Sequence, residues 1–183
     1  AEHTVEIRGS DAKSAELKEL LQEIKNDVDR TRRDMEFFRR PATQGSLLAL
    51  LFTYARLNPG VRYVQGMNEV AAVIFWVMAS ADPECAEADA FWCFSELMVD
   101  IKEGFMQALD HTGEGVYGLV EGVTKLIRSY DPELARHLQK SELPPFVFLV
   151  RWCTVLFAQD ATLPDLVRLW DAFVADPRRF ELV

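Results

Sequence analysis

The apolar residues of this chain recur at helical spacing, and no segment alternates apolar and polar residues as a strand does. Near the N-terminus they repeat at steps of three and four residues: Leu17, Leu20, Leu21, Ile24 and Val28. This spacing places them on one face of a helix. The range 44–57 has the same pattern, and 67–79 is apolar on all sides, which predicts a central, buried helix.

Turn and capping residues divide the remaining sequence into further helices. The run Asn-Pro-Gly at 58–60 ends the second helix. Asp82-Pro83 and Asp131-Pro132 each combine a capping carboxylate with a proline at the first helical position. The further predicted helices span 83–97, 103–109, 116–129, 132–138, 146–157 and 163–173. We therefore predict an all-α fold of seven to nine helices.

The length and composition of the chain fit one domain. It has 183 residues, of which 49% are hydrophobic, and this is enough for a substantial core. No low-complexity linker divides it and its four tryptophans follow no fixed period, so we expect a single compact multi-helix body. The longest uncharged apolar run, 70–81, is shorter than the roughly 18 to 20 residues of a membrane-spanning helix. We expect no direct membrane insertion, and the polar range 1–14 does not resemble a signal peptide.

The charge of the chain limits its partners. A formal net charge of −9 opposes binding to nucleic acid or to an anionic membrane surface. The range 30–40 differs, because it contains five arginines and only two acidic residues. This cluster indicates an anionic target, although the same arginines could lie on a solvated helix face. The three cysteines form no C-x-x-C pair and the three histidines lack metal spacing, so we expect a reducing compartment and no bound metal.

One candidate site lies near the end of the first predicted helix, in the sequence Ile24-x-x-Asp27-x-x-Arg30-Thr31. Asp27 precedes Arg30 by three residues and Thr31 by four, so all three share one helix face. The carboxylate can then hold the guanidinium in one rotamer, ready for an anionic partner. The same spacing also occurs in ordinary intrahelical ion pairs, which contribute a few tenths of a kcal/mol at a surface.

A second candidate site follows the predicted turn, in the sequence Tyr63-x-Gln65-Gly66-Met67-Asn68. The amide of Gln65 can both donate to an anionic oxygen and accept from a water molecule. Gly66 at a helix start permits close approach of the backbone to a ligand. Tyr63 and Met67 are expected to pack the turn, and Asn68 could brace it by hydrogen bonding. The alternative is a capping segment whose glutamine is merely solvated.

A guanidinium and a neutral amide are the two groups that an incomplete GTPase active site lacks. Negative charge spreads over the γ-phosphate oxygens during phosphoryl transfer, so an inserted arginine stabilises the transition state and an amide orients the attacking water. The chain has no phosphate loop of the type G-x-x-x-x-G-K-[ST]. Its G-x-G-x-x-G at 113–118 follows a helical segment, so we expect an interhelical loop there and no dinucleotide site. These features favour action on a nucleotide held by another protein.

Both motifs resemble those of the TBC domain of Rab GTPase-activating proteins, in which the arginine belongs to the first motif and the glutamine to the second. Here motif one spans 24–31 and motif two spans 63–68. A third segment, 152–171, is similar to a later segment of the family: Trp152, Phe157, Leu163-Pro164 and Arg168-Leu169-Trp170-Asp171. The resemblance implies an all-α, single compact multi-helix TBC-type domain over 1–183, incomplete at its C-terminus.

The resemblance also implies a mechanism. The chain would dock on a Rab-family small GTPase in the GTP-bound state and accelerate hydrolysis in trans. Arg30 would neutralise charge on the phosphates and Gln65 would orient the attacking water, as two fingers. Five residues would support these fingers: Asp27, Thr31, Tyr63, Gly66 and Asn68. GTP and Mg²⁺ would belong to the partner, so the chain would have no cofactor of its own and would be an activator, cytoplasmic and recruited to endomembranes by its Rab.

The chain departs from the family pattern beside both motifs. It has Arg32-Arg33 where a proline often follows motif one, and Arg62 and Val64 where glycine and cysteine often flank the tyrosine. These changes could tune partner choice without affecting the fingers. Trp170 of the third segment is expected to fix helix packing. Two alternatives stay open: a TBC-like module that binds a GTPase or scaffolds a trafficking complex without activating hydrolysis, and an unrelated helical interaction module.

Overall fold

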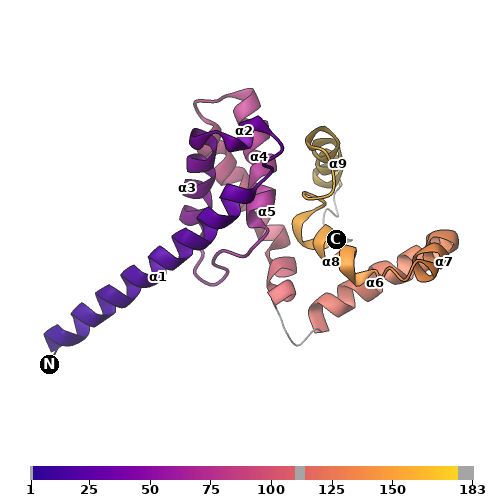
Figure 1. Cartoon of the computed structure of the whole chain (residues 1–183), viewed down its shortest axis with the longest axis horizontal. Coiled ribbons are helices and arrows are strands. Elements are labelled where there is room, and N and C mark those ends of the chain that lie inside the picture. The colour runs from indigo at the N-terminus through magenta and orange to yellow at the C-terminus, as the bar shows by residue number, and fades with distance from the viewer. Residues whose placement is uncertain (1, 110–113, 177–183) are drawn as a thin grey trace. The chain divides into compact units, whose positions relative to one another are not determined.

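A computed structural model describes residues 2–109 and 114–176 of the chain, and its helices are labelled in Figure 1. Within these two ranges there are nine helices and no strand. The helices are α1 Glu2–Arg30, α2 Glu36–Arg39, α3 Pro41–Leu57, α4 Met67–Ala81, α5 Ala86–Leu109, α6 Glu114–Tyr130, α7 Pro132–Lys140, α8 Phe146–Val155 and α9 Leu163–Ala175. The predicted all-α fold is confirmed. None of these described helices is long and apolar enough to cross a membrane.

The predicted start of a helix at Asp82-Pro83 is wrong. Helix α4 continues to Ala81, and the N–H of Asp82 donates to the carbonyl oxygen of Met78 at 2.9 Å, so Asp82 ends a helix. Its carboxylate then accepts from the N–H of Glu84 at 3.0 Å, which forms a turn before α5. An aspartate before a proline can serve either end of a helix, because its side chain also stabilises turns.

Two predictions about the later helices had opposite outcomes. Asp131 caps α7 as predicted, because its carboxylate accepts from the N–H of Leu134 at 2.9 Å. The G-x-G-x-x-G does not form the expected loop, since α6 begins at Glu114 and contains the rest of the motif. Gly113 lies outside the described residues. Gly115 and Gly118 therefore lie within a helix, which is unusual for a residue of low helix propensity.

The contacts between residues divide the chain into two compact units, Ala1–Ser95 and Glu96–Val183. The boundary lies within α5, which joins the predicted segments 83–97 and 103–109 into one helix. Because no proline or glycine stands beside this boundary and no linker interrupts the helix, the sequence contains no sign of the division. The sequence predicts a single body, whereas the contacts divide the chain into two units, each with its own apolar residues.

Helix α4 is the central helix of the first unit. Its residues 67–75 are all buried, which confirms the helix predicted from apolar residues on every side. Helix α1 packs against α3 and α4, and α3 also contacts α2 and α4. Tyr54 of α3 lies edge-on to Phe94 of α5, with ring centroids 5.0 Å apart. The short helix α2, which was not predicted, contributes the buried ring of Phe38.

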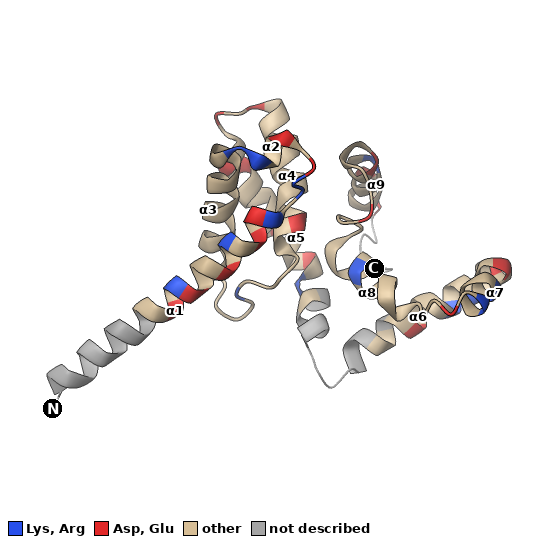
Figure 2. Ribbon diagram, viewed as in Figure 1, with Lys and Arg blue, Asp and Glu red and all other residues tan. Residues whose placement is uncertain are grey.

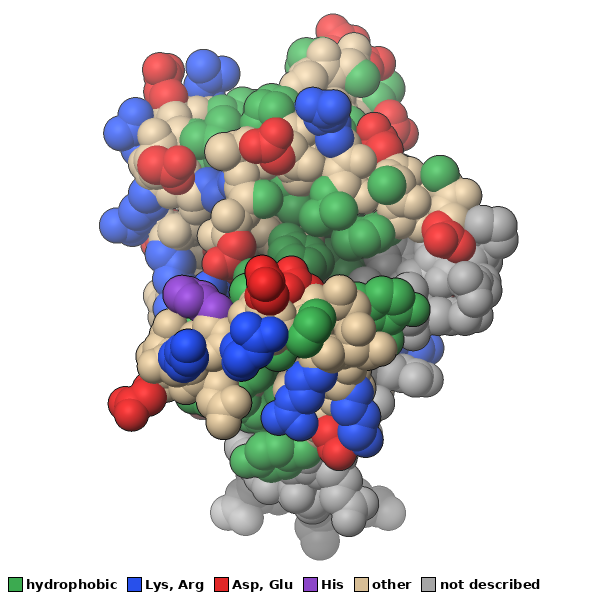
Figure 3. Space-filling view, turned by 90° about the vertical axis from the view of Figure 1, so that its right-hand side faces the viewer, with side chains coloured by type: hydrophobic (Ala, Val, Ile, Leu, Met, Phe, Trp, Pro, Cys, Tyr) green, Lys and Arg blue, Asp and Glu red, His purple; other side chains and the backbone are tan. Residues whose placement is uncertain are grey.

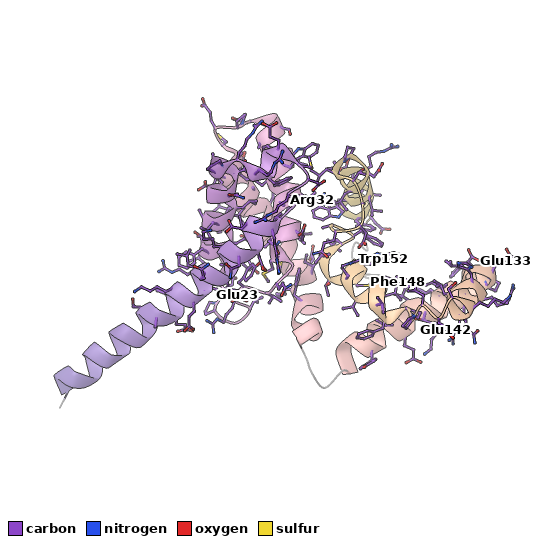
Figure 4. All side chains as sticks on the ribbon, viewed as in Figure 1. Glu23, Arg32, Glu133, Glu142, Phe148 and Trp152 are labelled. Atoms are coloured by element: carbon purple, nitrogen blue, oxygen red, sulfur yellow. The ribbon has the colours of Figure 1, made fainter. Side chains whose placement is uncertain are left out.

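In the second unit, α6 packs against α7 and α8. Its apolar centre includes Val120, Leu149, Phe148 and Trp152. The rings of Phe148 and Trp152 are 4.8 Å apart, and both residues are labelled in Figure 4. The third predicted segment lies in this unit, where the Trp170 indole N–H donates to the carbonyl oxygen of Leu156 at 2.8 Å. This contact supports the packing role expected for Trp170.

Candidate functional site

Motif one lies at the C-terminal end of α1, where the apolar face of the helix is anchored in the first unit. Ile24 and Val28 are both buried. Arg30 is the last helical residue, and 55% of its side chain is exposed. A cation at the end of a helix is favoured by the helix dipole. Figure 2 shows acidic and basic residues gathered at this end of α1. A packed helix therefore presents the guanidinium of Arg30 at the surface.

Asp27 is buried and holds Arg30 in place. The Nη2 atom of Arg30 lies 2.7 Å from Oδ1 of Asp27, three residues earlier on the same helix. The other carboxylate oxygen, Oδ2, accepts a hydrogen bond from the Tyr63 hydroxyl at 2.6 Å. Because each oxygen has its own donor, the buried carboxylate is well compensated. Asp27 thus connects Tyr63 of motif two to Arg30 of motif one.

Motif two follows a turn that is built on Asn58. The carbonyl oxygen of Asn58 accepts from the N–H groups of Val61 at 3.0 Å and Arg62 at 2.8 Å. Arg62 has a φ of 62°, in the left-handed region that reverses the chain. Directly after this reversal, Tyr63 and Val64 are buried. The turn therefore fixes the start of motif two against the core of the first unit.

Gly66 begins α4 in a conformation that glycine adopts readily and other residues do not. Its φ is 105°, and α4 starts at the next residue, Met67. Gln65 is exposed, whereas its neighbours Val64 and Gly66 are buried on either side. A side chain at Gly66 would strain this turn. The backbone thus directs the amide of Gln65 into solvent from between two buried residues.

A buried hydrogen-bond network joins the two motifs. Asn68 Oδ1 accepts from the N–H of Gly66 at 3.1 Å, and its Nδ2 donates to the hydroxyl of Thr31 at 2.9 Å. The Thr31 hydroxyl donates in turn to the carbonyl oxygen of Asp27 at 2.8 Å. Together with the bond from Tyr63 to Asp27, these contacts connect the end of α1 to the start of α4 at two points. All five residues predicted to support the fingers belong to this network.

The hydroxyl of Tyr63 acts as a permanent donor. Burial raises the pKa of Tyr63, and the hydrogen bond to the Asp27 carboxylate raises it further. The hydroxyl oxygen also lies 3.2 Å from Oδ1 of Asn68. A hydroxyl has a single proton, and the shorter bond to a carboxylate is the stronger of the two. Tyr63 therefore stays neutral at physiological pH, with its proton directed at Asp27.

Two more residues belong to this junction and were not predicted. Only 11% of the Arg32 side chain is exposed, and its Nε lies 4.0 Å from Oε2 of Glu69. The interpretation of the arginine cluster as a solvated face is therefore wrong for Arg32, although Arg33, Arg39 and Arg40 are exposed. One feature of the sequence could have indicated Glu69, because it is the acidic residue in the first turn of an otherwise apolar helix.

The site has the features of a rigid platform. Two flexible polar side chains, those of Arg30 and Gln65, are exposed next to a network of buried hydrogen bonds. Within the described ranges, no three His, Cys, Asp or Glu side chains are grouped as metal ligands would be. Such a platform can present a cation and an amide to another molecule.

Comparison with known proteins gives a consistent result. A family model described as the Rab-GTPase-TBC domain matches residues 2–183. TBC1 domain family member 13 of Homo sapiens is 41% identical over 139 residues, which cover 73% of this chain and 34% of that protein. The GTPase-activating protein gyp1 of Schizosaccharomyces pombe is 27% identical over 175 residues, covering 86% of this chain and 33% of that protein.

The fold is also similar to a solved structure. The crystal structure of the Ypt/Rab-GAP domain of Gyp1p matches with a TM-score of 0.75 and 22% sequence identity, covering 90% of this chain and 57% of that chain. At this identity the likeness concerns the fold alone. The chain spans about a third of the length of the curated relatives it matches. Because the family model matches almost every residue, this chain belongs to the Rab-GTPase-TBC domain family.

Proposed function

We propose that this domain accelerates GTP hydrolysis by a Rab-type small GTPase, with Arg30 and Gln65 acting in the partner's active site. The observation that carries the proposal is the buried network that links the two motifs while both finger side chains remain exposed. Family membership supports the choice of a Rab as partner. In this proposal GTP and Mg²⁺ are held by the partner GTPase.

The reaction explains why these two residue types are needed. Water attacks the γ-phosphorus, the bond to the β-γ bridging oxygen breaks, and negative charge shifts toward the leaving GDP. The guanidinium of Arg30 neutralises that charge with planar, directed N–H groups. The Gln65 amide accepts a hydrogen bond from the attacking water and donates one to a γ-phosphate oxygen. An arginine finger of this kind contributes about 10³ to 10⁵ in rate, or roughly 4 to 7 kcal/mol.

The contact between Asp27 and Arg30 serves as a resting position. More than half of the Arg30 side chain is exposed, so water can solvate the guanidinium as it leaves Asp27, and contacts with the phosphates replace the ion pair in the transition state. Asp27 keeps its bond from Tyr63 when Arg30 departs, and the buried carboxylate is then still compensated. The arrangement therefore keeps Arg30 extended from its helix without holding it back from a partner.

Single-turnover hydrolysis tests this proposal. A panel of GTP-loaded Rab proteins is mixed with an excess of the domain, and phosphate release is followed. We expect the domain to stimulate at least one Rab, and Arg30→Ala and Gln65→Ala each to reduce the stimulated rate by at least about 100-fold. Arg39→Ala is a matched control, because Arg39 is exposed on α2 and outside the network.

The same assay distinguishes the proposed activation of hydrolysis from the main alternative, which is binding without activation. A module that only binds a GTPase would form a complex with a GTP-loaded Rab and leave its hydrolysis rate unchanged. Full activity in either alanine variant would refute the two-finger mechanism. Equal losses in Arg30→Ala and Arg39→Ala would indicate a general electrostatic contribution to docking, because removing any nearby positive charge would then have the same effect.

A further inference from the structure

Arg32 differs from Arg30, Arg33, Arg39 and Arg40 of the same cluster because most of its side chain is shielded from solvent, beside an acidic residue. Its side chain is 11% exposed and that of Glu69 is 12% exposed, with the Nε of Arg32 lying 4.0 Å from the Glu69 Oε2. By contrast, the ion pair of Arg40 with Glu36 in the same unit is exposed on both sides. Burial reduces screening by water, so the charges of Arg32 and Glu69 interact more strongly at a given distance than those of an exposed pair do.

The backbone after α1 explains why Arg32 turns inward. The chain leaves the helix through a turn in which the N–H of Thr31 donates to Val28 and that of Met35 donates to Arg32, at 3.1 and 3.0 Å. Arg32 has a φ of 41°, which is disfavoured for a residue with a Cβ atom. The surrounding contacts must therefore hold this conformation. The ion pair to Glu69 is a contact of the Arg32 side chain itself.

Glu69 links this turn to motif two. It occupies the third position of α4, and its N–H donates to the carbonyl oxygen of Gly66 at 3.0 Å. One carboxylate oxygen lies 3.4 Å from the amide nitrogen of Asn68 and the other faces Arg32. Burial lowers the pKa of Arg32 while Glu69 opposes that shift, and an arginine stays charged in either case. Glu69 thus connects the helix start that follows Gln65 to the turn that follows Arg30.

We propose that Arg32 is a positioning residue for the arginine finger, and that its ion pair with Glu69 fixes the backbone on the C-terminal side of Arg30. Asp27, held by Tyr63, fixes the N-terminal side. The finger residue is therefore held between two independent contacts to the segment that carries Gln65. This inference rests on the proposed function, and it deepens it by naming what sets the geometry between the two fingers.

Positioning by this pair predicts an effect on the catalytic rate more than on binding. A displacement of about 1 Å in a catalytic group can cost about 100-fold in rate. Removing one partner alone would leave a buried charge uncompensated and would confuse positioning with unfolding. Replacing both partners with apolar residues of similar length avoids that problem, because such replacements of buried ion pairs often preserve stability. The informative variant is therefore Arg32→Met combined with Glu69→Met.

The experiment compares this double variant with the wild type and with Glu36→Met/Arg40→Met, which removes the exposed pair in the same way. We measure three quantities: the stimulated hydrolysis rate at a saturating concentration of the domain, the domain concentration that gives half of this rate, and the midpoint of urea unfolding. We also measure affinity for a Rab loaded with GDP and aluminium fluoride, and with a non-hydrolysable GTP analogue. The buried-pair variant should lose about 10- to 100-fold in rate and in affinity for the aluminium fluoride complex, with affinity for the GTP analogue within about twofold.

The outcomes are distinct. An unchanged saturated rate in the buried-pair variant, with Arg30→Ala inactive, would overturn this inference and leave the proposed function standing. Equal losses of affinity for both nucleotide states would also overturn it, because a purely structural role has that effect. Wild-type protein that stimulates no Rab would remove the proposed function and this inference with it. If the double variant does not fold, Arg32→Gln combined with Glu69→Gln removes both charges while keeping polar side chains of similar length, and an unchanged saturated rate in that variant would overturn the inference.

Discussion

The first unit buries its helices from several sides, whereas the second leaves large parts of two helices exposed. In the first unit, nine consecutive residues of α4 are buried. In the second, α7 has no buried residue, and Tyr130 at the end of α6 is 85% exposed. A cavity of about 590 Å³ opens between α6, α7 and the segment 142–145, with Ile127 and Leu138 in its lining. Figure 3 shows hydrophobic side chains reaching the surface among charged ones.

This difference indicates why the candidate site lies in the first unit. Hydrogen bonds between Asp27, Tyr63, Asn68 and Thr31 are buried, so each misplaced donor or acceptor would be costly. Such a network defines a geometry only where the surrounding helices cannot shift. Helices with few buried contacts open locally at lower free energy. We therefore expect precise catalytic geometry in the first unit and local flexibility at α7 in the second.

The largest expected effect concerns function in the first unit. Arg30→Lys retains the charge and loses the planar fork of N–H groups, so it should lower the stimulated hydrolysis rate by about 10³, or roughly 4 kcal/mol. Its unfolding free energy should stay within about 0.5 kcal/mol of wild type, since the side chain is half exposed. Hydrolysis under single turnover and urea unfolding measure the two quantities. A lysine variant with wild-type activity would show that charge alone suffices.

The second prediction compares aromatic residues of the two units. Phe38 is fully buried in the first unit, and Phe38→Ala should lower the unfolding free energy by about 3 to 5 kcal/mol. Tyr130 is exposed in the second unit, and Tyr130→Ala should change the unfolding free energy by less than about 0.5 kcal/mol. Urea unfolding followed by circular dichroism measures both.

These two variants can also contradict the difference in burial between the two units. A loss of more than about 2 kcal/mol in Tyr130→Ala would mean that its ring is covered by something in solution, and the contrast in burial would not describe the molecule. A loss below about 1 kcal/mol in Phe38→Ala would show that α2 is loosely attached, in which case the first unit would be smaller than its contacts indicate.

Tyr63→Phe should have an intermediate effect that depends on pH. The variant loses one hydrogen bond to a buried carboxylate, which should cost about 2 kcal/mol at pH 7. The pKa of Tyr63 is raised in the folded state above its ordinary value of 10.0, so the contribution is fully present below pH 10 and is lost as pH rises above it. Unfolding measured between pH 7 and 11 should therefore show the gap to wild type narrowing above pH 10. A gap that is constant over this range would show that folding does not raise the pKa of Tyr63.

The helices of this protein could largely be predicted because their signals are local. Apolar spacing gave α1 and α3, the continuous apolar run gave α4, and the aspartate and proline at 131 and 132 gave the start of α7. Helix α2 was missed because four residues are too few to show a period. The false start at Asp82 arose because the same side chain can cap a helix or stabilise a turn.

The candidate site could be predicted only as a set of residues. The bond from Tyr63 to Asp27 spans 36 positions and that from Asn68 to Thr31 spans 37, so no local pattern indicates them. From the sequence, Tyr63 appeared as a packing residue of the turn, and its hydroxyl contact was not foreseen. Arg32 was missed for a related reason, since its burial depends on a φ of 41° that the sequence does not reveal.

The smallest expected effect concerns α7, and it tests whether that helix depends on its cap. Asp131 accepts from the N–H of Leu134, and because α7 buries no side chain, few other contacts replace this bond. Asp131→Ala should cost about 1 kcal/mol locally and raise amide exchange in α7 about fivefold. Ser141→Ala, at the other end of the helix, is the control, because the Ser141 contact is made by its backbone N–H. Exchange that rises equally in α4 would show that the two units open together, and the difference between them would then be one of exposure and not of stability.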